Sequence, residues 1–162
     1  MNNLTLEDQK AVCHAEENAQ GHAQTIEAAA EAVAWLRKHP HAPDEARELS
    51  REARALMHEH EWDGDNREMV AETIEDSLSA LSVEFRCSQW SNTASNLEPD
   101  EYRILLTYGG PALQITGAFD AHNGATTARL EWQDWWKPWT EYHGVDEDAL
   151  LWFCSLFCLG DF

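Results

Sequence analysis

The chain has 162 residues, of which 43% are hydrophobic and eight are tryptophans. This length is typical of one domain, and the apolar content exceeds that of a disordered acidic segment. Thirty acidic residues against eleven lysines and arginines give a formal net charge of −19 at pH 7. Such a balance disfavours direct binding to nucleic acid, which needs clustered cations. It leaves two interpretations open, general solubility or complementarity to a cationic surface.

The N-terminal and cysteine patterns predict a cytoplasmic protein without membrane attachment. Residues 1–10, MNNLTLEDQK, lack the basic and apolar regions of a signal peptide. The longest apolar run, residues 149–160, is too short to cross a bilayer. The four cysteines are Cys13, Cys87, Cys154 and Cys158. They show neither a CxxC spacing nor the framework of a secreted scaffold, so we expect reduced thiols.

The spacing of apolar residues predicts three helices in the first half of the chain. A stripe with steps of three and four residues indicates one long helix that ends at His39-Pro40. Its members are Val12, Ala15, Ala19, Ala23, Ile26, Ala30 and Val33. A second helix is expected from about Asp44 to a break at residues 62–65. The third begins near Asp65, because Asp65 and Glu68 have the spacing of a capping box.

Beyond Leu81 the apolar pattern changes to strict alternation, which is typical of strands. Val83, Phe85 and Cys87 alternate with polar residues and predict a half-buried first strand. Three more strands are expected over residues 102–108, 112–119 and about 126–135. The turn signals are Gly109-Gly110-Pro111 and Asn123-Gly124. Successive strands with such short connections predict an antiparallel meander.

Residues 146–159 are expected to form a last helix that is apolar on nearly all sides, with acids at its start and Gly160 after its end. The predicted fold is therefore α+β, with N-terminal helices, a four-stranded antiparallel β-meander and a C-terminal apolar helix. We expect a helical region over residues 1–80 and a sheet with the C-terminal helix over residues 81–162, combined in one compact unit.

Acidic residues concentrate between residues 59 and 76, where Arg67 is the sole cation. The acids are Glu59, Glu61, Asp63, Asp65, Glu68, Glu72, Glu75 and Asp76. On the third helix, steps of three and four residues place carboxylates on one face about 5–6 Å apart, although like charges at this spacing repel. Such a row predicts a surface that imitates a phosphate backbone; the alternative is a solvated helix face. By contrast, Arg47, Arg51 and Arg54 are expected to pair with neighbouring glutamates.

Aromatic residues crowd the segment 132–142, WQDWWKPWTEY. Trp135, Trp136 and Trp139 cannot all point into a core from one strand, because successive side chains alternate between its faces. Tryptophan is enriched at interaction hot spots and its ring face attracts Arg and Lys. The segment therefore predicts an aromatic and acidic contact surface; the alternative is a bulky plug that closes the sheet against the last helix.

The sequence contains no recognisable catalytic or metal-binding motif. His58 and His60 would point to different faces of a helix, and Cys154 and Cys158 have no histidine nearby. There is no GxSxG segment and no glycine-rich phosphate loop. We therefore expect no catalytic residue, no metal and no cofactor, and the chain is predicted not to be an enzyme.

Two segments of the second half carry a resemblance to a known group. The matching residues are Leu105, Leu106, Gly109, Gly110, Pro111 and Ala112, followed by Gln133, Asp134, Trp135, Pro138, Trp139, Thr140, Glu141 and Tyr142. With these LL…GGPA and QDW…PWTEY segments, the chain resembles short acidic accessory proteins carried by proteobacterial phages, plasmids and integrative elements. The resemblance covers roughly the C-terminal half, and the N-terminal helices fall outside it.

The resemblance implies a mobile-element context, in which small acidic proteins imitate DNA and block host defence, as anti-restriction and anti-CRISPR inhibitors do. With the acidic region, it predicts an inhibitor of the anti-CRISPR type in the host cytoplasm, bound to a basic surface of a nucleic-acid-binding CRISPR-Cas or restriction complex. The predicted contact residues are Glu61, Asp63, Asp65, Glu68, Glu72, Glu75, Asp76, Trp135, Trp136 and Trp139. Two alternatives stay open, an assembly module that dimerises through its last helix and a small carboxylate-based enzyme.

Overall fold

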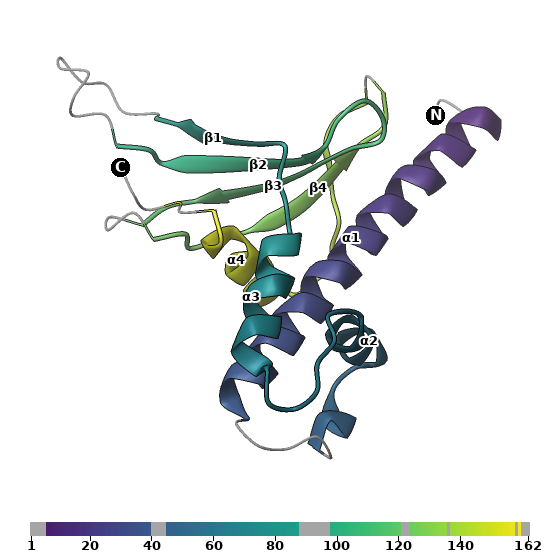
Figure 1. Ribbon diagram of the computed structural model, residues 1–162. Coiled ribbons are helices and arrows are strands. Elements are labelled where there is room, and N and C mark those ends of the chain that lie inside the picture. Colours follow the sequence, from purple (N-terminus) through teal and green to yellow (C-terminus); the bar gives the residue numbers. More distant parts are fainter. Residues whose placement is uncertain are drawn as a thin grey trace.

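The computed structural model describes residues 6–39, 45–87, 98–120, 124–135, 137–157 and 159. Helices combine with one antiparallel sheet, which confirms the α+β class (Figure 1). A long helix, α1, runs diagonally from beside the sheet into a group of shorter helices at its other end (Figure 1). The molecule therefore has a sheet part and a helical part, and α1 belongs to both.

Helix α1, Leu6–Lys38, is the predicted long helix and ends just before His39-Pro40, as expected. Most of the predicted stripe is buried, since Ala15, Ala19, Ala23, Ile26 and Val33 are each at most 2% exposed. Val12 lies outside the residues whose side chains are described, and Pro40 lies outside the described residues. The stripe consists mainly of alanines, which let neighbouring elements approach the helix axis closely.

The predicted second helix is split into a 3₁₀ turn, η1 (Glu45–Glu48), and the helix α2 (Arg51–Glu59). Its expected start, Asp44, lies outside the described residues. Helix α2 begins at Arg51 because the Ser50 hydroxyl accepts the Ala53 N–H at 3.0 Å and caps the helix. The Ser50 N–H in turn donates to Glu31 Oε1 on α1 at 2.9 Å.

Helix α3, Arg67–Ser77, follows the α2–α3 turn, and the predicted capping box is wrong. Asn66 occupies the cap position, and Asp65 does not bond to the backbone of Glu68. The start of α3 is held instead by Asp63, whose Oδ1 accepts the N–H groups of Asp65 at 3.0 Å and Asn66 at 3.1 Å. A side chain four residues before Arg67 therefore orders the turn that leads into α3, and no capping box forms there.

The sheet is an antiparallel meander, as predicted, but it has five strands and not four. The strands are β1 (Ser82–Arg86), β2 (Glu101–Thr107), β3 (Ala112–Ala118), β4 (Arg129–Gln133) and β5 (Thr140–Glu141). They pair in chain order. The fifth strand was missed because it has only two residues, opposite Glu131 and Trp132 of β4, which is too short for a periodic signal. Across the second turn, Asp120 and Gly124 bond to each other, and Asn123 lies outside the described residues.

The first strand differs from the half-buried strand that was predicted. Val83 packs against the core, whereas Phe85 is 41% exposed and Cys87, one residue beyond the strand, is exposed as well. The cause is position, because β1 is the edge of the sheet and pairs only with β2. An alternating pattern therefore identified the strand but not the extent of its burial.

The two faces of the sheet differ in chemistry. Ile104, Ile115 and Leu130 lie opposite one another on adjacent strands, are fully buried, and pack with α1 and α4 in one hydrophobic cluster. The other face is polar and carries cross-strand ion pairs, Arg86 with Glu101 at 2.6 Å and Arg103 with Glu84. Helices thus cover one face of the sheet, and charged side chains alternate on the other.

A second hydrophobic cluster joins the C-terminal half of α1 to α2 and α3, with Val33, Leu36, Met57 and Ile74 at its centre. Trp152 packs against both clusters. The predicted division into residues 1–80 and 81–162 stays a prediction. The described residues place α1 in both clusters, so the two halves of the chain share a helix.

Helix α4, Glu147–Ser155, is shorter than the helix predicted over residues 146–159. The Asp146 carboxylate caps it by accepting the Asp148 N–H at 3.1 Å. Four of its residues, Ala149, Leu150, Phe153 and Cys154, are buried. After Ser155 the hydrogen bonds tighten to the i→i+3 type, which ends the helix before the expected Gly160; Gly160 itself lies outside the described residues. Within the described part of the chain, no helix has both the length and the apolar character needed to span a bilayer.

The ring of Tyr102 packs directly on Gly117, which leaves no room for a larger residue there. The Tyr102 hydroxyl donates to the Thr127 carbonyl at 2.6 Å, and a Cβ atom at Gly117 would overlap both the Tyr102 ring and that carbonyl. Gly117→Ala should therefore lower the free energy of unfolding by about 1–3 kcal/mol, the usual cost of overpacking. Urea unfolding measures the change.

The control is Gly21→Ala on α1, where an added methyl group meets nothing within 4 Å. It should raise the free energy of unfolding by about 0.5–1 kcal/mol, because alanine favours the helical conformation. Equal effects of the two substitutions would show that the packing of Tyr102 on Gly117 is not tight.

Burial of Cys154 beside Tyr102 predicts a loss of stability in alkali. Burial raises the pKa of the Cys154 thiol from 9.0 to about 11, and burial together with Cys154 raises the pKa of Tyr102. Above pH 9.0 the unfolded chain therefore releases protons that the folded chain retains, so stability falls as the pH rises through this range. We expect a loss of roughly 2 kcal/mol by about pH 10.5 from the thiol. Urea unfolding of Cys154→Ala should show a correspondingly weaker pH dependence, and an unchanged slope would contradict the assignment.

Candidate functional site

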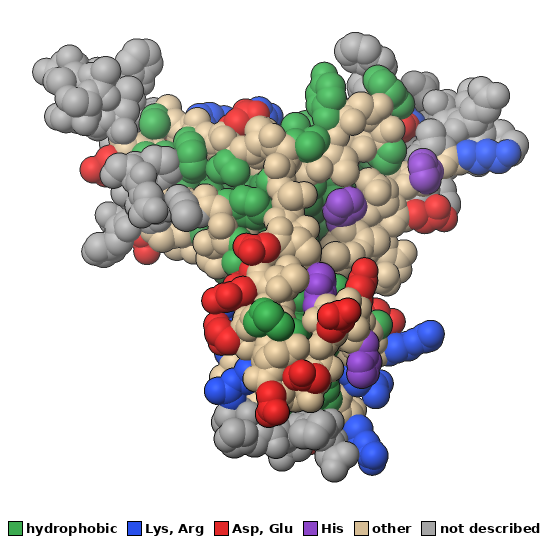
Figure 2. All heavy atoms as spheres, in the orientation of Figure 1, with side chains coloured by type: hydrophobic (Ala, Val, Ile, Leu, Met, Phe, Trp, Pro, Cys, Tyr) green, Lys and Arg blue, Asp and Glu red, His purple; other side chains and the backbone are tan. Residues whose placement is uncertain are grey.

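The acidic region predicted from the sequence lies on the end of α2, the α2–α3 turn and the outer side of α3. Figure 2 shows acidic side chains gathered over the helical part of the molecule, around exposed hydrophobic atoms. Met69, which is 59% exposed, is the large apolar residue of α3 on that outer side. Glu72 and Asp76 follow it at steps of three and seven residues and are exposed on the same side of α3. We call Met69, Glu72 and Asp76, with Glu61 and Asp65 of the turn, the acidic surface.

The predicted carboxylate row on α3 is divided by Arg37 of α1. The Arg37 guanidinium forms two hydrogen bonds to Glu75, Nη1 to Oε1 and Nη2 to Oε2, each at 2.8 Å. Its Nε lies 3.5 Å from Glu68 Oε1. These contacts, first of all with Glu75, raise the pKa of Arg37. Glu68 and Glu75 are therefore partly neutralised within the chain, which corrects the expectation of one continuous free row.

Two acids of the predicted row, Glu72 and Asp76, keep their full negative charge at the surface. Neither forms an ion pair with any residue that the structure describes. Helical geometry explains the division. Glu68 and Glu75 lie on the flank of α3 next to α1, whereas Glu72 and Asp76 lie opposite the buried side formed by Val70, Ala71 and Ile74. The sequence spacing predicted one face for these acids, whereas the structure divides them between a flank that contacts Arg37 of α1 and the outer side.

Two predicted contact residues, Glu61 and Asp63, form hydrogen bonds that stabilise the α2–α3 turn. Glu61 adopts the left-handed conformation, with φ of 57°, and follows the end of α2. There the Glu61 N–H bonds to the His58 carbonyl and the Trp62 N–H to the Met57 carbonyl, each at 3.1 Å. This is the Schellman arrangement, in which glycine is usual because other residues pay about 1 kcal/mol for the conformation. Asp63 holds the start of α3, as described above, so its carboxylate is directed into the turn.

The tryptophan segment lies at the far end of the molecule from α3. The segment that follows β4 is at the end of the sheet near the start of α1, whereas α3 lies in the helical part (Figure 1). Trp135 is 60% exposed, Trp139 is partly buried, and Trp136 lies outside the described residues. The structure thus does not bring the predicted acidic and aromatic contact residues together into one surface.

The tertiary structure brings together the GGPA and QDW segments, on which the predicted resemblance was based. The indole of Trp135 lies directly against Gly110, where it would overlap a Cβ atom, so only glycine fits there. Asp134 is 7% exposed and pairs with Lys137 Nζ at 3.1 Å. Gln133 Nε2 donates to the Lys137 carbonyl at 2.6 Å. The GGPA turn and the QDW segment therefore form one packed corner of the sheet.

The arginines next to the acidic region do not behave as predicted. Arg47, Arg51 and Arg54 were expected to pair with neighbouring glutamates, but no such ion pair forms within the described part of the chain. Arg54 Nε donates only to the Ser50 carbonyl, at 3.4 Å. On α2, Arg51, Arg54 and His58 lie along one side, while Glu52 and Glu59 lie on the other. Helical position keeps the opposite charges apart.

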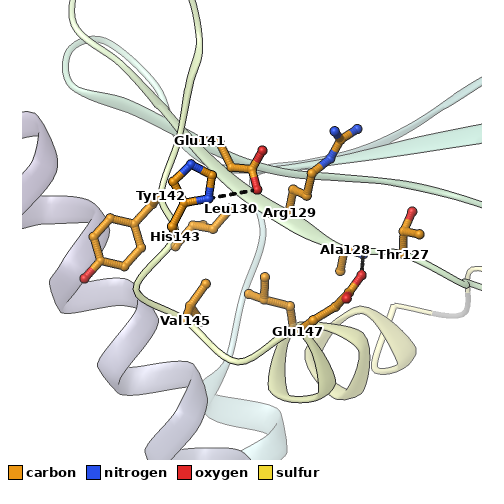
Figure 3. A pocket seen from close by; sticks show the side chains of 10 residues that line it. Thr127, Ala128, Arg129, Leu130, Glu141, Tyr142, His143, Val145 and Glu147 are labelled. Atoms are coloured by element: carbon orange, nitrogen blue, oxygen red, sulfur yellow. Dashed lines mark hydrogen bonds and ion pairs between the residues drawn. The ribbon is translucent and has the colours of Figure 1, made fainter.

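A pocket of about 470 Å³ between β4, β5 and the start of α4 was not anticipated from the sequence (Figure 3). His143 Nδ1 lies 3.3 Å from Glu141 Oε1, but the His143 side chain is 80% exposed, so the pair is solvated and contributes little. Glu147 Oε1 accepts the Ala128 N–H at 3.2 Å, and Thr127 Oγ1 accepts the Ala118 N–H at 3.1 Å. These polar groups join strands and helix, and no nucleophile paired with a base results from them.

Among the residues that the structure describes, no three His, Cys, Asp or Glu side chains are placed to share a metal ion. Cys154 is buried beside Tyr102, whereas Cys87 is exposed. The side chains of Cys13 and Cys158 lie outside the described set. The expected absence of metal and cofactor therefore stays a prediction.

The contact of Arg37 with Glu75 gives a prediction for stability. Arg37→Gln should lower the free energy of unfolding by about 1 kcal/mol, because it removes a two-pronged ion pair and leaves the largely buried Glu75 carboxylate unpaired. Lys38→Gln, the same charge change at the next position, should alter it by less than about 0.5 kcal/mol. Chemical unfolding at low and high salt measures both, and an equal loss in the two variants would mean that only net charge matters.

Comparisons with protein-family models, with curated proteins and with solved structures found no match to this chain. The resemblance of the C-terminal half to accessory proteins of mobile elements therefore stays a prediction.

Proposed function

We propose that this protein is an anti-defence inhibitor of the anti-CRISPR type that docks its acidic surface onto a basic, nucleic-acid-binding surface of a host defence complex. The observation that carries the electrostatic part is the exposure of Glu72 and Asp76 on the outer side of α3 without ion pairs in the described residues. The defence context comes from the resemblance of the C-terminal half to accessory proteins of mobile elements.

The repulsion between carboxylates on the acidic surface supports this function, because a cationic partner would relieve it. Glu68, Glu72 and Asp76 are spaced four residues apart on α3, and like charges at this spacing destabilise a helix by about 0.2–0.5 kcal/mol per pair. Arg37 offsets part of this repulsion on one flank only. A partner with clustered lysines and arginines would relieve the rest, and it would associate quickly because opposite charges steer the encounter.

Met69 adds a short-range component to the proposed docking. Its side chain is 59% exposed between carboxylates, in the pattern of an apolar centre with a charged rim that is common at protein interfaces. A methionine suits such a position, because its flexible thioether adapts to partner surfaces of different shape. Met69 replaces the tryptophans as the apolar contact expected next to the acids.

The alternative functions have less support. Dimerisation through α4 would need a free apolar side, but Leu150, Phe153 and Cys154 are buried in the chain's own core. Carboxylate chemistry would need two facing acids in a cavity. Glu141 and Glu147 line the pocket of Figure 3, but each already contacts a group of the same chain.

The test replaces the two free acids with their amides, in the double variant Glu72→Gln, Asp76→Asn. Pull-down from a host lysate at low salt, followed by identification of the captured protein, supplies the partner for titration. We expect the affinity to fall by roughly tenfold and to depend less steeply on salt, because two charge contacts are lost.

The matched control is Glu48→Gln, Glu52→Gln, which removes the same charge from exposed positions on η1 and α2. It should leave the affinity within about twofold of the unmodified protein, since exposed charges beyond about 8 Å are screened at physiological ionic strength. The docking site is rejected if both double variants bind equally well. Met69→Glu, which places a charge at the proposed apolar centre, should weaken binding further.

A further inference from the structure

The helical part has a second, opposite electrostatic feature beside Trp62. A pocket of about 380 Å³ lies between η1, α2 and the α2–α3 turn, and its lining includes Arg47, Arg54, Met57, His58 and Trp62. Lys and Arg side chains are visible along the edge of the molecule where α2 and η1 lie (Figures 1 and 2). In a chain with a net charge of −19, this pocket concentrates cationic groups.

The two arginines of the pocket are available to a ligand. Arg37, Arg86 and Arg103 each pair with a carboxylate, whereas Arg47 and Arg54 do so with none of the residues that the structure describes. Both are exposed, and they come from separate elements, η1 and α2. Guanidinium groups are planar forks of N–H donors that match the geometry of phosphate oxygens.

The aromatic wall of the pocket is held in place before any ligand binds. The N–H of Trp62 bonds to the Met57 carbonyl at the end of α2, which fixes the backbone. The Trp62 ring contacts Trp35 edge to face, with centroids 5.5 Å apart and an interplanar angle of 89°. Trp35 is 7% exposed and stacks on His39. A fixed indole beside Met57 offers an apolar surface to a planar ring at little ordering cost.

Asp63 is the acid that lines this pocket. Its Oδ1 accepts the N–H groups of Asp65 and Asn66, so two backbone donors face that carboxylate oxygen and direct it into the turn. Glu61 and Asp65 of the acidic surface flank Trp62 and Asp63 in the chain, but neither of them lines the pocket. Two arginines and one carboxylate leave the lining itself with a net positive charge, which favours an anion.

We propose that this pocket binds a phosphate monoester carried on a planar ring, of the chemical class of a nucleoside monophosphate. Arg47 and Arg54 would hold the phosphate, and Trp62, which Met57 supports from within the core, would contact the ring. The volume is within the usual range for small-ligand sites. The pocket lining shares no residue with the acidic surface, and the variants that test it leave Glu72 and Asp76 unchanged, so failure of this proposal and failure of the proposed inhibitor function are distinguishable.

Calorimetric titration of the full chain with adenosine monophosphate, adenosine and inorganic phosphate tests the proposal. Adenosine monophosphate should bind about tenfold or more tightly than adenosine, because the phosphate adds charge-assisted contacts. It should also bind more tightly than inorganic phosphate, because the base adds contact with Trp62. Equal affinity for adenosine and its monophosphate, or no binding of adenosine monophosphate at millimolar concentration, overturns the proposal.

Arg47→Gln and Arg54→Gln should each weaken adenosine monophosphate binding on the order of tenfold. Arg51→Gln is the matched control, since it removes the same charge from the same side of α2 but lies outside the pocket lining. An equal loss with Arg51→Gln would indicate diffuse attraction and reject the site. Trp62→Leu separates the two halves of the ligand, because it should weaken binding of adenosine monophosphate and leave inorganic phosphate unaffected.

Discussion

The close packing of α1 against two different sets of elements is the constraint on which the rest of the structure depends. Going along the helix, α1 lies against β4 and then, from about Glu27, against α4, while its C-terminal half also packs against α2 and α3. Small side chains make this possible, since Ala15, Ala19, Ala29 and Ala32 are fully buried. Leucines at these positions would push both sets of elements away from the helix axis. One helix therefore fixes the distance between sheet and helical part.

Charge is organised by the same framework. A net charge of −19 opposes compactness. Several of the chain's cations form ion pairs that connect one element to another. Arg37 joins α1 to α3, Arg86 and Arg103 join β1 to β2, and Lys137 closes the corner after β4. Within the described parts of the chain, Glu72 and Asp76 on α3 and Arg51 and Arg54 on α2 form no ion pairs. The two potential interaction sites thus have opposite sign and lie on neighbouring helices.

Most of the described tryptophans pack within the fold, and fewer are exposed as contact residues than the sequence predicted. Trp132 is buried on β4, Trp152 packs against both hydrophobic clusters, and Trp35 with Trp62 stabilises the end of α2. The exposed Trp135 covers the Gly110 turn of the sheet and is not part of the acidic surface. The proposed docking therefore uses carboxylates around Met69, and the tryptophan corner stays outside it.

Patterns within single elements determined the helix stripe, the meander and the concentration of acids between residues 59 and 76, because periodicity and local charge depend on neighbours in the chain. The sequence alone predicted a single face for Glu68, Glu72 and Glu75 or Asp76 and a helix start near Asp65, whereas in the structure these acids lie on two sides of α3. Only the tertiary structure decided which carboxylates are free, since Arg37 reaches Glu68 and Glu75 from a helix about thirty residues earlier. It also revealed β5, which has too few residues for a period, and the pocket beside Trp62, which combines two helical elements and a turn. Such features arise from distances between segments, and no local pattern encodes those distances.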